Sequence, residues 1–349
     1  LERGREAAVD RDLIPLNGSV LRFGSVRDVV DKTVGGDSFA ISLYGDLMSI
    51  AWEFQGDRDD LAVQVSNVQA WTEASKTTID AQHQLFPSAL AREQPGASLL
   101  STLSDLRYVP ADRLGPAETY PLEDRKRHGS LGARAELAFG GLYWQREEPV
   151  AAQQMMHPDP AVAPRQDRQV EAWLADLFPG AKFHIERIMV ANRVTLGIRT
   201  SDKTEFHRPQ NVGFGLTYVL PVLIGLLGAK IGDLIILENP EAHLHPRAQS
   251  RIGRLCALAA SAGIQVLIET HSEHVLNGAR LAVHDELLSP TDALALFFTR
   301  DVESGECDFQ KITVARNGQL SGWPSGFFDE SSRILDALLS PVAKAGDGP

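Results

Sequence analysis

The fold is decided by the stretch Leu234-Ile235-Ile236-Leu237-Glu238-Asn239-Pro240-Glu241. Its four consecutive aliphatic residues predict a strand buried on both faces, as the strands of parallel sheets are. The pattern then recurs, because a helix is expected over residues 246–262 and a second apolar strand over residues 264–268. Strands and helices that alternate with short connections predict an α/β fold with a parallel sheet.

Polar side chains follow both strands, since the second one runs into Glu269-Thr270-His271-Ser272. Neighbouring parallel strands end at the same edge of a sheet, so we expect Glu238, Asn239, Glu241 and His271 to share one rim. A carboxylate placed there can hold Mg²⁺, which keeps its waters and takes one or two protein carboxylates plus phosphate oxygens. The imidazole of His271 could contact a terminal phosphate or position a water.

A second candidate segment is Asn211-Val212-Gly213-Phe214-Gly215-Leu216-Thr217-Tyr218, at the start of a helix expected over residues 214–229. Glycines let a phosphate approach the backbone, and a helix N-terminus offers unpaired N–H groups with a partial positive charge. Thr217 could add a hydroxyl donor. Gly213, Gly215 and Thr217 are therefore candidate phosphate-binding residues.

The rest of the chain surrounds this core with less regular patterns. Alternating apolar residues predict an antiparallel β region over residues 38–72, and residues 106–110 are expected to form a strand. Residues 111–165 are rich in Gly, Pro, Arg and Glu, so a mobile lobe is expected there. Further on we expect a helix over 168–178, a hairpin of 183–190 with 193–200, strands at 294–299 and 309–315, and a helix at 334–339.

Composition narrows the function classes. The 349 residues carry 46 Asp and Glu against 34 Lys and Arg, a net charge of −12, which argues against a protein dominated by nonspecific phosphate binding. The basic run Arg125-Lys126-Arg127-His128 is the exception. No apolar stretch is long enough to span a membrane, and the two cysteines indicate a reducing compartment, with Cys256 as a buried thiol. We expect a cytoplasmic protein with no membrane partner.

At these motifs the sequence resembles the ABC-type ATPase heads of the SMC-like, RecF-like and OLD-like group, which are AAA-family ATPases. It is most similar to a bacterial subfamily that has a C-terminal domain of unknown function. The resemblance rests on four segments. The signature segment is Val212-Gly213-Phe214-Gly215-Leu216-Thr217, and the Walker B and D-loop segment is Glu238-Asn239-Pro240-Glu241-Ala242-His243-Leu244-His245-Pro246. The switch-histidine segment is Thr270-His271-Ser272-Glu273-His274, and the tail motif is Trp323-Pro324-Ser325-Gly326-Phe327-Phe328-Asp329.

The resemblance implies an ATPase that uses ATP and Mg²⁺ and dimerises around nucleotide. Glu238 would hold the metal, Glu241 or Asn239 would position the attacking water, and His271 would sense the γ-phosphate. Gly213, Gly215 and Thr217 would act on the partner's nucleotide. The group implies roles in DNA maintenance or phage defence, with DNA and a separately encoded effector such as a nuclease as expected partners.

The resemblance also implies a domain organisation. The core would be an ABC-type head with a mainly parallel sheet flanked by helices, an antiparallel β region and an inserted helical lobe. We expect an N-terminal β-rich part at residues 1–110 and the inserted lobe at residues 111–205. The motif-bearing core would follow at residues 206–290, and the domain of unknown function at residues 291–349.

Two features depart from the family pattern. No Gly-x-x-x-x-Gly-Lys-Ser/Thr phosphate loop occurs in the 349 residues, and because the chain begins at Leu1 we expect that loop on residues preceding it. Without the loop, the chain is expected to be inactive. In addition, Asn239 stands where many ABC ATPases have the catalytic glutamate, and an amide cannot act as a general base.

Two other interpretations remain open. His243 and His245 follow a buried strand and, with His271 and His274, could form the metal site of a hydrolase. Alternatively, the chain could be a non-hydrolysing scaffold or sensor in which nucleotide only clamps two heads together, an interpretation that Asn239 supports.

Overall fold

A computed structural model describes most of the chain. The described residues are 13–18, 21–32, 35–45, 47–72, 76–79, 85, 99, 101–103, 105–124, 130–324, 326–328 and 330–340. The basic run at residues 125–128 lies outside them.

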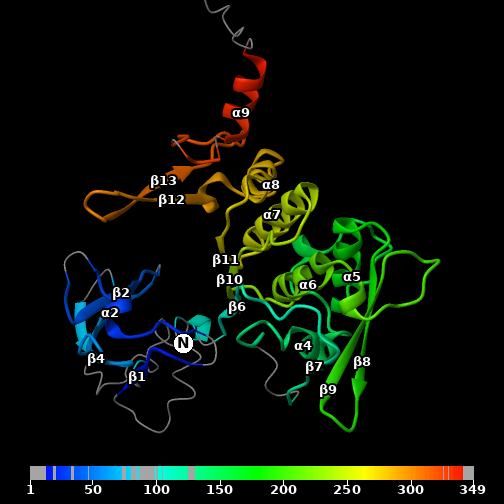
Figure 1. The fold of residues 1–349 in the computed structure, drawn as a ribbon, viewed down its shortest axis with the longest axis horizontal. Coiled ribbons are helices and arrows are strands. Elements are labelled where there is room, and N and C mark those ends of the chain that lie inside the picture. The colour runs from blue at the N-terminus through cyan, green and yellow to red at the C-terminus, as the bar shows by residue number, and fades with distance from the viewer. Residues whose placement is uncertain are drawn as a thin grey trace, which may run out of the picture.

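The central sheet is parallel, as the sequence predicts. It contains β6 (Arg107–Val109), β10 (Leu234–Glu238) and β11 (Gln265–Glu269) in the order β11–β10–β6. In Figure 1 the three strands lie at the centre of the view, between the blue N-terminal strands and the green and yellow helices. One face of the sheet points into the main hydrophobic core, where Ile235 and Leu237 are fully buried.

Three helices belong to this core, α6 (Phe214–Leu227), α7 (Pro246–Ser261) and α8 (Glu273–His284). Helix α6 lies against β6 and β10, α7 lies against β11, and α8 packs against α7. Helix α6 is buried along almost its whole length, which explains its nearly continuous apolar sequence. Helix α7 starts with Pro246 at its first turn. Ser272 is the N-cap of α8, and its side chain accepts hydrogen bonds from two backbone N–H groups of that helix. The expected strand–helix alternation is confirmed.

The expectation of a mobile lobe at residues 111–165 is wrong for the described part of that segment. Helix α4 (Ala138–Gln145) forms there, and Tyr120, Phe139 and Met155 are at most 1% exposed. The indole N–H of Trp173 donates a 3.0 Å hydrogen bond to the carbonyl of Met155, which ties the segment to the next helix. The apolar anchors are isolated along the chain, so they produce no periodic pattern.

The same layer contains the amphipathic helix and the hairpin expected from the sequence. These elements are α5 (Gln166–Leu177), β8 (Lys182–Ile188) and β9 (Arg193–Arg199), and β9 also pairs with β7 (Tyr120–Pro121). One hydrophobic cluster takes residues from this layer, from α6 and α7, and from the central sheet. The inserted lobe and the motif-bearing core therefore share a single core.

The N-terminal part is an antiparallel sheet with its own hydrophobic cluster, which confirms the expected β region. Strands β2, β3 and β4 pair in sequence, while β1 and β5 both pair with β4. A short helix, α2, packs its Val26 into this cluster. The elements are β1 (Ile14–Pro15), α2 (Val26–Val29), β2 (Ser38–Leu43), β3 (Ser49–Gln55), β4 (Ala62–Trp71) and β5 (Lys76–Ile79).

The C-terminal part consists of a hairpin and a helix, β12 (Leu294–Arg300), β13 (Cys307–Thr313) and α9 (Glu330–Leu339). Short 3₁₀ helices lie at Gln153–Met155, Pro209–Asn211 and Pro290–Asp292. Cys256 is buried, as expected, and burial raises the pKa of its thiol to about 12. Within the described ranges, no helix combines the length and apolarity needed to cross a bilayer.

Candidate functional site at the carboxyl edge of the parallel sheet

The two acidic strand ends lie side by side. Glu238 and Glu269 are register partners at the last positions of β10 and β11. The backbone N–H of Asn239 then donates a 2.9 Å hydrogen bond to the carbonyl of Glu269, which continues the pairing by one residue. Asn239 has a φ of +43°, a left-handed conformation that asparagine tolerates better than most residues. The chain therefore turns sharply at the rim where ligands of open α/β sheets bind.

The carboxylate of Glu238 is held from the neighbouring strand β6. Its Oε2 accepts a 3.0 Å hydrogen bond from the backbone N–H of Ala111, the second residue after that strand. The hydroxyl of Tyr108 also bonds to Glu238, and burial together with this bond raises the pKa of Tyr108. The side chain of Glu238 is thereby fixed, half-buried, at the sheet edge.

Glu241 and His271 meet across the same edge. The backbone N–H of His271 donates a 2.8 Å hydrogen bond to Oε1 of Glu241. The other oxygen of Glu241, Oε2, is buried and has no hydrogen-bond partner among the described residues. Buried carboxylate oxygens are nearly always satisfied, so an atom of this kind marks a place where a water or a cation fits.

The imidazole of His271 lies outside this pair and points to solvent. Its side chain is 84% exposed, and Nε2 lies 3.2 Å from Oε1 of Glu269. The ring is thus tethered to the end of β11 while remaining accessible. The predicted rim of Glu238, Asn239, Glu241 and His271 is therefore assembled in the structure.

Arg113 is a component of this rim that the sequence analysis did not single out. Its side chain is fully buried, and its guanidinium donates to the carbonyls of Pro110, Glu238 and Asn239 at 3.0, 2.9 and 2.8 Å. Burial lowers its pKa, and Tyr218, Glu241 and Glu238 act in the opposite direction. The planar guanidinium of Arg113 thus holds the backbone of Glu238 and Asn239 in place. The sequence feature that could have identified Arg113 is the charged pair Asp112-Arg113, which comes shortly after an apolar strand.

Arg113 also connects the rim to α6. Its guanidinium lies over the ring of Tyr218, 5.1 Å from the ring centroid, and Tyr218 in turn packs edge-on against His243 at 4.9 Å. His243 belongs to the turn between β10 and α7 and has a φ of +63°. The turn after the acidic strand is therefore packed against the helix that follows the glycine segment.

The three candidate residues of the glycine segment differ in their surroundings. Gly213 is exposed at the N-cap of α6, and a Cβ atom added there would meet nothing within 4 Å. A Cβ at Gly215 would lie 2.5 Å from the carbonyl oxygen of His243, so Gly215 is required for close packing. Thr217 is fully buried, and its hydroxyl donates a 3.0 Å hydrogen bond to the carbonyl of Phe214. The structure places only Gly213 on the surface.

The described residues contain no group of three or more His, Cys, Asp or Glu side chains that could hold a metal ion. His243 and His271 do not converge on a shared site with His245 and His274, so the histidine-rich hydrolase interpretation gains no support. Two carboxylates, one with an unsatisfied buried oxygen, suit a hard cation that takes its remaining ligands from water and phosphate. The donor set therefore fits Mg²⁺ accompanied by a phosphate ligand.

Comparisons with known proteins place these motifs in a family. A family described as "AAA domain, putative AbiEii toxin, Type IV TA system" matches residues 21–277. A second family, a protein of unknown function (DUF3696), matches residues 288–338. No curated protein matches the sequence significantly.

Among solved structures, matches include a chain from work on ATP-driven dimerisation and DNA-stimulated activation of SMC ATPases. That chain is 11% identical with a TM-score of 0.35, and the match covers 51% of this chain and 93% of that one. An SMC head bound to the C-terminal winged-helix domain of ScpA is 12% identical with a TM-score of 0.39, covering 76% and 74%. An SMC head from Pyrococcus furiosus is 12% identical with a TM-score of 0.30, covering 50% and 38%.

Proposed function

The chain belongs to the AAA-domain family that matches residues 21–277, a family of P-loop nucleotide hydrolases, and we propose that it is an ATP-binding and hydrolysing head that dimerises around nucleotide. The observation that carries this proposal is the buried, unsatisfied Oε2 of Glu241 beside the fixed carboxylate of Glu238. These two groups would need a cation and a polar ligand to satisfy them, and both stand at the edge of the sheet where nucleotides bind.

Each rim residue has a distinct proposed role. Glu238 would hold Mg²⁺, which when bound neutralises phosphate charge. Glu241 would orient the attacking water and accept its proton, because one of its oxygens is fixed by His271 while the other remains available. His271 would contact the γ-phosphate through its exposed imidazole. Asn239 would assist in placing the water but could not take its proton.

The positive cradle for the triphosphate must come from a part of the protein that carries a phosphate loop. At the rim, the guanidinium of Arg113 is buried and bonded to backbone carbonyls, and the other side chains include the carboxylates of Glu238, Glu241 and Glu269. These carboxylates would repel a triphosphate unless cations and backbone N–H groups balanced them. The 349 residues do not contain the phosphate-loop motif.

The central sheet offers a place for such a segment. Tyr108, Ile236 and Leu267 are register neighbours on one face, and Leu267 is 56% exposed although it belongs to a parallel strand. Parallel sheets are ordinarily covered on both faces, so a strand beside β11 followed by a helix over this face would complete the sheet. Such a unit would bring a helix N-terminus to the rim beside Glu238, which lies on the same face.

Dimerisation is proposed from the glycine segment. Gly213 exposes the N-terminus of α6, where unpaired N–H groups and a partial positive charge favour an anion. The γ-phosphate of a nucleotide bound to a second copy could lie there. Gly215 and Thr217 would then act indirectly, by packing the start of α6 in the position that this contact needs. We further propose a role in DNA maintenance or phage defence within the cytoplasm, with DNA and a separately encoded effector, such as a nuclease, as partners.

The second candidate function is a non-hydrolysing scaffold, which the amide of Asn239 after the metal-binding acid favours. Steady-state phosphate release by a protein completed with its phosphate loop separates the two functions. Hydrolysis requires Mg²⁺ in our account, so Glu238→Gln should raise the Mg²⁺ concentration needed for half-maximal release at least about tenfold. Glu306→Gln, which changes an exposed carboxylate beside β13 in the C-terminal part, is the matched control. Release no faster than the uncatalysed rate would favour the scaffold.

A further inference from the structure

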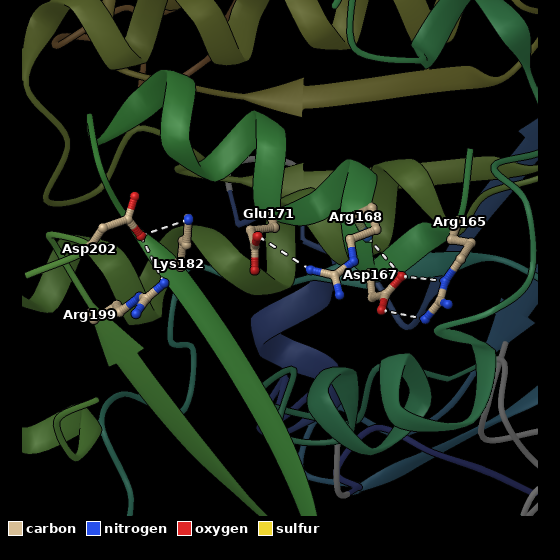
Figure 2. Close-up of polar contacts among 7 residues, drawn as sticks. All are labelled: Arg165, Asp167, Arg168, Glu171, Lys182, Arg199 and Asp202. Carbon is tan, nitrogen blue, oxygen red and sulfur yellow. Dashed lines mark hydrogen bonds and ion pairs between the residues drawn. The ribbon is translucent and has the colours of Figure 1, made fainter. Parts of the chain in front are cut away.

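A cavity of about 390 Å³ lies where α4 and α5 meet the β8–β9 hairpin. No residue of the candidate nucleotide site lines it. Figure 2 shows seven charged side chains of this region in two groups. Lys182, Arg199 and Asp202 form one group, and Arg165, Asp167, Arg168 and Glu171 form the other. Its walls are formed by Leu142, Tyr143, Arg146, Asp167, Arg168, Glu171, Lys182, Phe183, His184, Ile185, Arg199 and Phe206.

The walls carry more positive than negative charge. Four lining residues are cationic, Arg146, Arg168, Lys182 and Arg199, and two are acidic, Asp167 and Glu171. The chain as a whole has a net charge of −12, so a cationic cavity is opposite in sign to the rest of the molecule. A cavity of this kind concentrates anions from solution.

One group brings two cationic heads together. Asp202 lies outside the cavity and accepts hydrogen bonds from Lys182 Nζ at 2.7 Å and from Arg199 at 2.8 Å (Figure 2). The single exposed carboxylate of Asp202 is thus the shared hydrogen-bond acceptor of Lys182 and Arg199. In addition, Nε of Arg199 is buried and has no hydrogen-bond partner among the described residues. Lys182 and Arg199 therefore retain N–H donors for a ligand.

The two acidic residues of the lining are already engaged. Asp167 accepts two hydrogen bonds from Arg165, at 3.1 and 2.8 Å, and a third from the backbone of Arg168. Glu171 lies 3.6 Å from Arg168, and its pKa is raised, chiefly by burial. Asp167 is therefore paired with Arg165, which does not line the cavity, and the raised pKa of Glu171 favours its uncharged form, so the lining opposes an anion less than two free carboxylates would.

Two further cations are held only loosely. Arg146 reaches Glu147 at 3.9 Å and is stacked on the ring of Tyr143. The side chain of Arg168 contacts Glu171 at 3.6 Å and forms no other ion pair with the residues that the structure describes. Their side chains are 42% and 55% exposed. Exposed ion pairs of this length contribute little to folding stability, so these arginines can turn toward a ligand at low cost.

Apart from the imidazole of His184 and the hydroxyl of Tyr143, the remaining walls are apolar, and they set the size and character of the ligand. Leu142, Tyr143, Phe183, Ile185 and Phe206 line the space between the charged groups. Pockets of roughly 300 to 1,000 Å³ hold small organic molecules and are too small for a duplex. We propose that this cavity binds a small organic phosphate, whose phosphate group lies among Arg146, Arg168, Lys182 and Arg199 and whose apolar or aromatic body contacts these walls.

Calorimetry on residues 1–349 tests this site, with AMP and inorganic phosphate as the probes. The buffer contains EDTA, so that Mg²⁺-dependent binding at the sheet edge does not contribute. We expect AMP to bind with a submillimolar Kd and at least about tenfold more tightly than inorganic phosphate, because only AMP has a body to bury. Arg146→Gln and Arg168→Gln should each weaken AMP binding at least about fivefold, because each removes a charge-assisted hydrogen-bond donor.

Arg254→Gln is the matched control, because it removes one cation and one ion pair, with Asp285, outside the cavity. It should leave AMP binding unchanged, and thermal unfolding should show that all three variants are folded. The proposal is overturned if neither probe binds at millimolar concentration, or if Arg146→Gln and Arg168→Gln bind AMP as the unchanged chain does. It is also overturned if only a DNA duplex binds and the same two variants abolish that binding. None of these results depends on ATP hydrolysis.

Discussion

The backbone N–H of His271 donates a 2.8 Å hydrogen bond to Oε1 of Glu241, which joins the residue after β11 to the turn after β10. This bond orients the carboxylate so that its second oxygen is buried beside the end of the sheet without a partner among the described residues. The two strand ends are thus connected by the group that we propose as the catalytic base.

Replacing Glu241 by Gln should slow phosphate release at least about tenfold in a protein completed with its phosphate loop. Glutamine preserves the acceptor for the His271 N–H but cannot take a proton from water. ATP binding should remain, because Glu238 is untouched. The measurements are steady-state phosphate release and equilibrium ATP binding. Asn239→Gln should have a much smaller effect, and equal effects of the two substitutions would refute the assignment of the base.

Arg113→Lys should lower the free energy of unfolding by about 2–4 kcal/mol, because lysine cannot reproduce the fork that reaches three carbonyls. Those carbonyls would lose buried, charge-assisted hydrogen bonds. Urea denaturation measures the change. Arg134→Lys is the control, because that side chain is 50% exposed and bonds to the exposed Asp112, and it should change the value by less than about 0.5 kcal/mol. Similar values for the two variants would show that Arg113 does not hold the rim.

Gly215→Ala should cost about 1–3 kcal/mol of stability, since its Cβ would lie 2.5 Å from a backbone oxygen of His243 that cannot easily move. Gly213→Ala meets no atom within 4 Å and should cost about 0.5 kcal/mol or less. Thermal or urea unfolding of the pair gives the comparison. If Gly213→Ala is the more destabilising change, the packing of α6 against the turn after β10 has been misjudged.

Gly213→Glu should abolish ATP-dependent dimerisation of the completed protein, because it places a carboxylate at the exposed helix terminus that would face the partner's γ-phosphate. Gly215→Glu is unsuitable for this test, since any side chain there disturbs folding. Light scattering in the Glu241→Gln background, with and without ATP, measures the dimer. Nucleotide binding by the monomer should persist, and an unchanged dimer would rule out the trans arrangement.

The sheet edge could be predicted from the sequence because buried parallel strands give continuous apolar runs, and the polar residues that end them must share an edge. Arg113 could not be predicted in its role, because its partners are backbone carbonyls that no side-chain pattern reveals. The burial of Thr217, which the sequence analysis treats as a hydroxyl donor to phosphate, could not be predicted either. A hydroxyl one turn into a helix can face either way, and here it bonds to the carbonyl of Phe214 in the interior.

The packing of the segment around Met155 could not be predicted from the sequence either. Its buried residues are separated by polar and glycine-rich stretches, so neither helical nor strand periodicity appears, and composition alone indicated a mobile lobe. Only tertiary contacts, such as the hydrogen bond from Trp173, identify it as part of the core.

The most direct test of the account is calorimetric titration of Mg·ATP into residues 1–349 that carry Arg146→Gln and Arg168→Gln, so that the cavity between α5 and the β8–β9 hairpin does not contribute. The titration is done on this chain alone and with the segment that carries the phosphate loop, supplied in cis or as a separate chain. The account predicts no micromolar binding by residues 1–349 alone, because Glu238 and Glu241 would repel a triphosphate that lacks its cradle of N–H groups and lysine. It predicts micromolar binding once that segment is present. Micromolar binding by residues 1–349 alone would contradict it.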